Sequence, residues 1–166
     1  MTAAQDGGKA TELGTVLAMT PADLADREML HQLINDYAAA VDQRDRAQFR
    51  SLWVDGGVLV TFRSGSHRPP LGERRAPNDL DAIVDHLQRY DRTLHVVSNH
   101  RVVIDGDLAT GEANCEAHHL TEANDHIMAI RYVDRYRRVA GSWLFAHRAV
   151  NVLWTSDVTV TQTPLG

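Results

Sequence analysis

Apolar residues in the first third of the chain recur at three- and four-residue steps, the spacing of a helix with one buried face. Thr20 and Pro21 precede this pattern and are typical of a helix N-cap and a first helical position. The apolar positions that follow are Leu24, Leu30, Leu33, Ile34, Tyr37, Ala38 and Val41. The polar run Asp42–Asp45 predicts the end of this helix, and a second short helix carries Phe49 and Trp53 on one side.

The pattern of apolar positions then changes to that of β-strands. Residues 58–62 predict a strand, and the three prolines within residues 63–77 predict an irregular loop. Asn78 or Asp79 is expected to cap a third helix. Four further segments, most of them rich in β-branched or aromatic residues, predict strands over residues 93–104, 108–121, 126–138 and 143–155.

This order of elements, helices first and a long meander last, predicts one α+β domain. The expected architecture is a curved antiparallel sheet with the helices packed on one face, and hairpin turns at Asp105–Asp107 and Ala140–Ser142. We expect the domain to span residues 20–157. Residues 1–19 are then a flexible N-terminal tail, and residues 158–166 a C-terminal tail.

Charge and composition exclude several classes of function. The chain has 166 residues, with 17 Lys and Arg against 22 Asp and Glu, for a formal net charge of −5. A net anion gains little from nucleic acid or an anionic membrane, so neither is an expected partner, and the basic segment Arg131–Arg138 is interpreted as a solvated strand face. The single cysteine, Cys115, excludes an internal disulfide. With no secretory signal or membrane-length apolar run in the sequence, we expect a cytoplasmic protein.

Nine histidines suggest acid–base or metal chemistry, because histidine titrates near neutral pH. The sequence holds no glycine-rich phosphate loop, no G-x-S-x-G and no H-E-x-x-H. His118 and His119 are adjacent, so on a strand they point to opposite faces and do not chelate one ion. We therefore expect no metal site.

One strand pairing would bring polar residues together. If the chain turns over a four-residue loop at residues 105–108, His95 lies opposite His118, and Asn99 lies opposite Asn114. Directly opposed residues share a face of the sheet, with Cβ atoms about 5 Å apart. Such a face would suit the polar end of a pocket, although a bulge or a slip of one residue would destroy it.

Several short segments spread along the predicted domain form one recognisable set. They are Ala25–Leu30, Tyr37–Asp45, Phe49–Trp53, His95–Asn99, Asp105–Asp107, Arg131–Asp134, Gly141–Trp143 and Arg148. Over about residues 22–155 this set resembles the SnoaL-like family of the nuclear transport factor 2-like superfamily. It is most similar to the branch with scytalone dehydratase, bile acid 7α-dehydratase and hexachlorocyclohexane dehydrochlorinase.

The resemblance implies a cone-shaped fold around an apolar pocket, and a lyase or isomerase that needs no cofactor. Asp42 and His95 match the family's catalytic pair, in which the histidine removes a proton from carbon. Tyr37 matches an assisting tyrosine, and His118 matches a second pocket histidine. By the same analogy Arg131 reaches the pocket. The resemblance also implies a homodimer or homotrimer.

Apolar walls would exclude water from such a pocket and strengthen its electrostatic interactions. The expected wall residues are Leu33, Val60, Phe62, Val97 and Trp154, and Asn99 is expected to contact the substrate. A hydrophobic ring or polyketide-like molecule would fit. Two alternatives stay open: a non-catalytic binding or assembly protein, and an epoxide hydrolase, whose carboxylate cluster has no clear match here.

Overall fold

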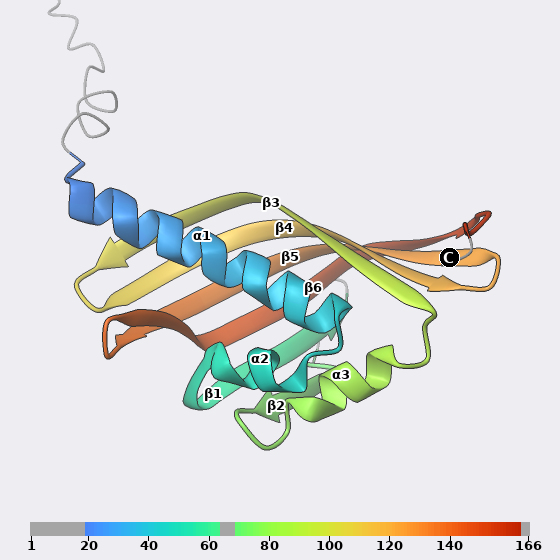
Figure 1. The fold of residues 1–166 in the computed structure, drawn as a ribbon, viewed down its shortest axis with the longest axis horizontal. Coiled ribbons are helices and arrows are strands. Elements are labelled where there is room, and N and C mark those ends of the chain that lie inside the picture. The colour runs from blue at the N-terminus through green and yellow to red at the C-terminus, as the bar shows by residue number, and fades with distance from the viewer. Residues whose placement is uncertain (1–18, 64–68, 164–166) are drawn as a thin grey trace, which may run out of the picture.

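A strongly curved sheet of six strands forms the body of the protein, and the long helix α1 lies across its concave face (Figure 1). The structure is a computed structural model that describes residues 19–63 and 69–163. The elements in chain order are α1 (Pro21–Asp42), α2 (Arg46–Ser51), β1 (Trp53–Arg63), β2 (Gly72–Arg75), α3 (Asp81–Leu87), β3 (Arg92–Asp105), β4 (Leu108–Thr121), β5 (Asn124–Val139) and β6 (Ser142–Thr159). The α+β class and the curved sheet covered by N-terminal helices are as predicted.

Helix α1 begins and ends where the sequence predicts. The Thr20 hydroxyl accepts a hydrogen bond from the Asp23 backbone at 3.1 Å, and the Asp23 carboxylate accepts one from the Thr20 backbone at 2.8 Å. This reciprocal capping box satisfies two amides at the helix start. The helix ends at Asp42, and the next turn contains Arg44 with a left-handed φ of 60°.

The strand order is β2-β1-β6-β5-β4-β3, and one pair departs from the predicted antiparallel sheet. β1 runs parallel to β6, which makes the sheet mixed, while the remaining neighbours are antiparallel. The reason is topological. β1 follows the helices at the start of the chain and joins the free edge of the last strand, so no hairpin sets its direction.

Two local predictions between the helices were wrong. The stretch 63–77 contains a short strand, β2, whose Arg74 pairs with Leu59 of β1. Its prolines lie outside the strand and therefore leave its backbone amides free to pair. Helix α3 begins with Leu80 as N-cap and no side-chain cap, because the Asp79 carboxylate accepts a hydrogen bond from the Arg75 backbone at 3.3 Å instead.

A bulge in β3 changes which side chains face the concave side. Near the hairpin turn the pairing is as predicted, with Arg101 opposite Glu112, but beyond it Ser98 lies opposite Asn114. β3 thus has two residues where β4 has one, and Asn99 adopts a left-handed φ of 54°. One extra residue reverses the faces of the rest of the strand. His95 consequently pairs with Ala117 rather than with His118.

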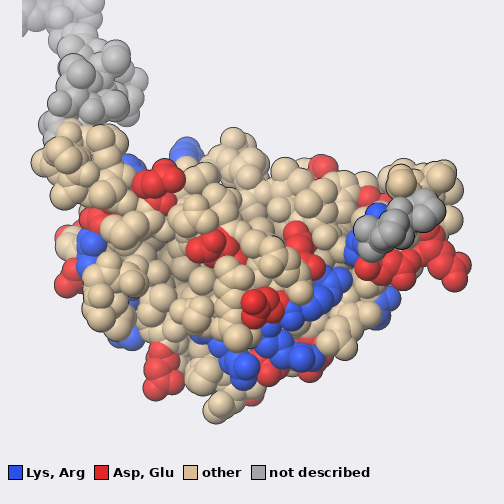
Figure 2. All heavy atoms as spheres, in the orientation of Figure 1, with Lys and Arg blue, Asp and Glu red and all other residues tan. Residues whose placement is uncertain are grey.

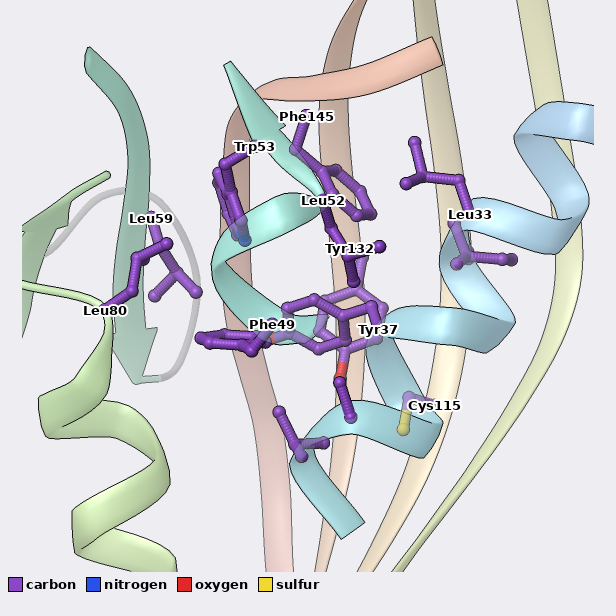
Figure 3. Close-up of a cluster of buried hydrophobic side chains, with 14 of the residues drawn as sticks. Leu33, Tyr37, Phe49, Leu52, Trp53, Leu59, Leu80, Cys115, Tyr132 and Phe145 are labelled. Carbon is purple, nitrogen blue, oxygen red and sulfur yellow. The ribbon is translucent and has the colours of Figure 1, made fainter. Parts of the chain in front are cut away.

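An ion pair lies at the centre of the hydrophobic core. The Arg148 guanidinium is fully buried and donates to both carboxylate oxygens of Asp134, at 2.9 and 2.7 Å. Its central carbon lies 4.2, 4.0 and 4.3 Å from the ring centroids of Tyr37, Tyr132 and Phe145. These three rings come from α1, β5 and β6 and meet in the aromatic cluster of Figure 3. The cation is thus enclosed by its counter-ion and by π faces.

The C-terminal boundary of the domain lies beyond the predicted residue 157. β6 continues to Thr159, and Val160 donates a backbone hydrogen bond to Ala123 at 2.8 Å. Arg92 then binds the Thr163 carbonyl at 2.7 Å, so residues 158–163 pack on the domain. Most of the predicted N-terminal tail, residues 1–18, lies outside the described residues. None of the described helices is long and apolar enough to cross a membrane.

Asp134→Ala is expected to lower the free energy of unfolding by about 3–5 kcal/mol, because it leaves the Arg148 charge buried without a counter-ion. Urea denaturation followed by circular dichroism measures the change. Glu112→Ala is the control, since Glu112 forms an exposed pair with Arg101 at 3.8 Å and its loss should cost less than about 1 kcal/mol. Equal effects of the two variants would contradict a stabilising role of the buried pair.

Candidate active site

A pocket of about 410 Å³ lies on the concave side of the sheet, between β1, β5, β6 and the helices α1 and α3. Its apolar lining includes Val41, Leu59, Ile83, Met128, Ile130 and Val152. Four histidines also line it: His86, His95, His119 and His126. The volume is in the range of small-molecule sites, which are mostly apolar with a few polar groups.

Asp42 and His95 form a hydrogen-bonded pair at the edge of this pocket. The His95 Nδ1 lies 2.7 Å from Asp42 Oδ1, and the His95 backbone amide donates to Asp42 Oδ2 at 2.9 Å. The His95 side chain is 8% exposed and the Asp42 side chain 19%. The two residues are 53 positions apart in sequence. They meet because the C-terminal end of α1 packs against β3.

Two neighbouring side chains hold Asp42 in this position. The Thr93 hydroxyl donates to Asp42 Oδ1 at 2.8 Å, and Arg44 donates to the Thr93 hydroxyl oxygen at 2.6 Å. Arg44 also donates to the carbonyls of Val41 and Leu87, at 2.9 and 3.1 Å. The left-handed turn after α1 directs this arginine back onto the end of its own helix. Asp42 is thereby fixed by contacts from several directions.

These contacts define the protonation of the pair. Burial acts to raise the pKa of Asp42, but hydrogen bonds from His95 and Thr93 outweigh it and hold this pKa below its ordinary value. An ionised carboxylate only accepts hydrogen bonds, so the Nδ1 of His95 carries the hydrogen. Nε2 is then the ring nitrogen that accepts a proton, and His95 lines the pocket. Such a pair suits general-base catalysis.

His119 is a second buried imidazole beside the pair, although it was expected to point to the face opposite His118 and so away from the pocket. Its ring centroid lies 5.6 Å from that of His95, at an interplanar angle of 81°. Its Nδ1 lies 3.1 Å from the His126 carbonyl, which only accepts, so Nδ1 carries the hydrogen. Burial, with a further contribution from His95, lowers the pKa of His119 to about 4. His119 is therefore neutral at pH 7.

His118 lies on the opposite face of the sheet, and its predicted position beside His95 was wrong. The bulge in β3 brings Leu94 opposite His118. The His118 ring lies between two carboxylates, with Nδ1 2.6 Å from Asp125 and Nε2 3.1 Å from Glu116. The hydrogen bond to Asp125 is the main cause that raises the pKa of His118. This histidine is a surface group with no access to the pocket.

Tyr37 lines the pocket, as the resemblance implies. It is buried in the aromatic cluster, where its ring packs against Phe49 and Tyr132 at centroid distances of 5.2 and 5.8 Å (Figure 3). Burial raises the pKa of its hydroxyl to about 12. The hydroxyl consequently keeps its hydrogen at neutral pH and is able to donate it in a hydrogen bond.

The structure does not bring the other predicted binding residues into the pocket. Asn99 and Arg131 are exposed and line a separate surface hollow. Trp154 is 67% exposed. Phe62 alternates with the lining residues of β1 and points away from them, and Val97 packs against the core without lining the pocket. For Phe62 and Arg131 the cause is strand alternation, because each lies one position from a lining residue and faces the other side.

His86, His119 and His126 line the pocket but were not predicted to do so. His119 lies on the concave face of β4 by the regular alternation of that strand, together with the buried Ala113, Cys115 and Ala117. A left-handed residue inside a strand is typical of asparagine or glycine, so Asn99 was a sequence signal for the bulge that brings His95 to the same face as His119. No group of three or more His, Cys, Asp or Glu side chains placed to hold a metal ion occurs in the described part of the chain.

Residues 22–149 match the SnoaL-like domain, and the chain therefore belongs to the SnoaL-like family of the nuclear transport factor 2-like superfamily. No curated protein sequence matches the chain.

Several solved structures share the fold. A scytalone dehydratase-like protein from Novosphingobium aromaticivorans is 20% identical, with a TM-score of 0.71 over 86% of this chain and 94% of that one. A hexachlorocyclohexane dehydrochlorinase from Novosphingobium barchaimii is 21% identical, with a TM-score of 0.71 over 85% and 97%. A protein of unknown function from Mycobacterium tuberculosis is 23% identical, with a TM-score of 0.69 over 80% and 76%. At these identities the likeness shows the fold.

The pKa values of the adjacent histidines His118 and His119 are expected to shift in opposite directions from the ordinary value of 6.5. His119 should stay neutral down to about pH 4, since burial opposes its charge, whereas His118 should protonate above pH 6.5. A pH titration of the imidazole signals by NMR measures both, with His118→Gln and His119→Gln to assign them. Two midpoints near the ordinary value would contradict the placement of the two rings.

Proposed function

We propose that this protein is a lyase or isomerase that needs no cofactor and removes a proton from a carbon atom of an apolar small molecule, with His95 as the base. The observation that carries the proposal is the partly buried hydrogen bond of 2.7 Å between His95 and Asp42 at the edge of an apolar pocket. Membership of the SnoaL-like family and the fold shared with a dehydrochlorinase support it. The dyad combines with water exclusion to favour proton transfer.

The step is a proton transfer from a carbon beside a carbonyl group to His95 Nε2. The electron pair of the broken C–H bond forms an enolate, and then a C=C bond as a neighbouring hydroxyl departs. His95 returns its proton to that hydroxyl, so the products are an unsaturated ketone and water. Without a leaving group, return of the proton to another carbon moves the double bond instead. Asp42 stabilises the imidazolium throughout.

The two other polar groups at the pocket have different roles. Tyr37, whose raised pKa keeps it protonated, donates a hydrogen bond to the enolate oxygen. His119 does not act as an acid at neutral pH, because its lowered pKa leaves it without a proton to give at Nε2. An epoxide hydrolase is disfavoured, since no acidic side chain is among the described residues that line the pocket.

The convex face of the sheet carries exposed apolar side chains, among them Val96 of β3 and Trp154 of β6. The homodimer or homotrimer implied by the family resemblance stays a prediction, and the molar mass from light scattering measures it.

His95→Ala is expected to lower kcat by about 10²- to 10⁴-fold, the usual contribution of a general base. The assay uses β-hydroxy ketones built on one or two apolar rings, in D₂O. NMR then follows both exchange of the α-hydrogen and loss of water. Asp42→Asn should lower kcat as well, because it removes the carboxylate that orients and stabilises the imidazolium.

The matched control is His118→Ala, which changes a histidine of the neighbouring strand on the opposite face and should keep kcat within about twofold. Equal activity of His95→Ala and the wild type would exclude His95 as the base. Thermal stabilisation by these ketones without exchange or water loss in any of them would identify a binding protein instead.

A further inference from the structure

The mouth of the pocket carries positive charge that the proposed reaction does not use. Arg63, Arg74 and Arg89 line it, from the end of β1, from β2 and from the segment after α3. No acidic residue is among the described lining residues, although the whole chain has a net charge of −5. The pocket therefore has a charge opposite to that of the chain.

These three arginines differ from the arginines on α2 in forming no ion pair within the described part of the chain. Arg46 and Arg50 on α2 form ion pairs with Asp85 and Asp81 of α3. Arg63, Arg74 and Arg89 have no carboxylate within 4.0 Å among the described residues. A guanidinium without a counter-ion is available to an anion that enters the pocket.

Strand alternation in β2 explains why Arg74 has no carboxylate partner on its own strand. Glu73 and Arg75 point to one face and pair with each other at 2.6 Å. Arg74, between them, points to the pocket side, where it lies opposite Leu59 of β1. Glu73 is thus paired on the outer side of β2, and only the charge of Arg74 remains on the pocket side.

Two of the arginines are held in place by neutral groups. Arg89 donates to the Tyr90 hydroxyl at 2.6 Å and lies 4.7 Å above the Tyr90 ring. Arg74 donates to the Glu73 carbonyl at 2.9 Å. Neither contact neutralises the charge. Figure 2 shows basic side chains gathered around α2 and α3 on this side of the molecule, with acidic ones among them.

We propose that the pocket takes a substrate with an apolar ring system and an anionic group, and that Arg63, Arg74 and Arg89 bind the anionic group at the mouth. This inference rests on the proposed function in taking the pocket as the substrate site. The apolar floor and His95 then receive the ring, while the guanidinium groups bind a carboxylate or another oxyanion through charge-assisted hydrogen bonds. The arginines determine substrate orientation and specificity.

The test compares two probes of equal shape, 2-naphthoate and 2-naphthamide, by isothermal titration calorimetry at pH 7.5. The naphthoate is expected to bind at least tenfold more tightly than the neutral amide. Because exposed charges are screened by salt, its affinity should fall between 50 and 500 mM NaCl, while that of the amide should not. 2-Naphthyl phosphate distinguishes a carboxylate preference from a general oxyanion preference.

The double variant Arg74→Gln and Arg89→Gln should reduce naphthoate affinity to within about twofold of that of the amide. Arg75→Gln is the matched control, because Arg75 is the next residue on β2, points to the other face and should leave the affinity unchanged. Circular dichroism verifies that each variant folds. An amide that binds as tightly as the naphthoate, an equal loss in Arg75→Gln, or no binding of either probe at 1 mM would overturn the proposal.

His95→Ala separates this inference from the proposed function. The variant should keep the preference for naphthoate, because binding at the mouth needs no base. A preference for naphthoate in a protein that turns over none of the ketones would support the anion site and contradict the lyase. Turnover of neutral ketones together with equal binding of both probes would support the lyase and overturn the anion site.

Discussion

The placement of α1, and with it that of the site, depends on the contacts of the buried Arg148 guanidinium. Asp134 neutralises it, and the Tyr37 ring of α1 packs on its face at 4.2 Å. Near its other end α1 is held by Asp26, which accepts two hydrogen bonds of 2.6 Å from Arg138. A helix fixed at these two points has little freedom to rotate. Asp42, five residues beyond Tyr37, is consequently held against β3 in one orientation.

The end of α1 supplies the carboxylate of the Asp42–His95 pair and holds it in place. Asp42 is the last residue of the helix, where a carboxylate gains nothing from the helix dipole, so its contacts must come from elsewhere. The backbone amide and ring of His95 and the Thr93 hydroxyl supply them. Arg44 binds Thr93 and the last carbonyls of the helix together. A loop held by so many contacts keeps the dyad aligned without a substrate.

The sequence predicted the features that depend on residues close together in the chain or on the family resemblance. The start and end of α1, the meander and the Asp42–His95 pair came from spacing, capping residues and family resemblance. The pairing of His95 with Ala117 rather than His118 did not, because it depends on one extra residue at Asn99 that reverses the alternation in half of β3. The arginines at the mouth were missed for a different reason: Arg63, Arg74 and Arg89 lie on three elements that meet only in the folded chain.

The two histidines beside each other at the pocket differ in their partners, and only His95 has the carboxylate that the proposed base requires. Their centroids are 5.6 Å apart, so two imidazolium ions would repel each other in a poorly solvated pocket. His95 has Asp42 behind it, whereas His119 has only a backbone carbonyl at its Nδ1. A carboxylate stabilises the protonated ring far more than a neutral carbonyl does. Burial and the neighbouring His95 together lower the pKa of His119, and its ring stays neutral at pH 7.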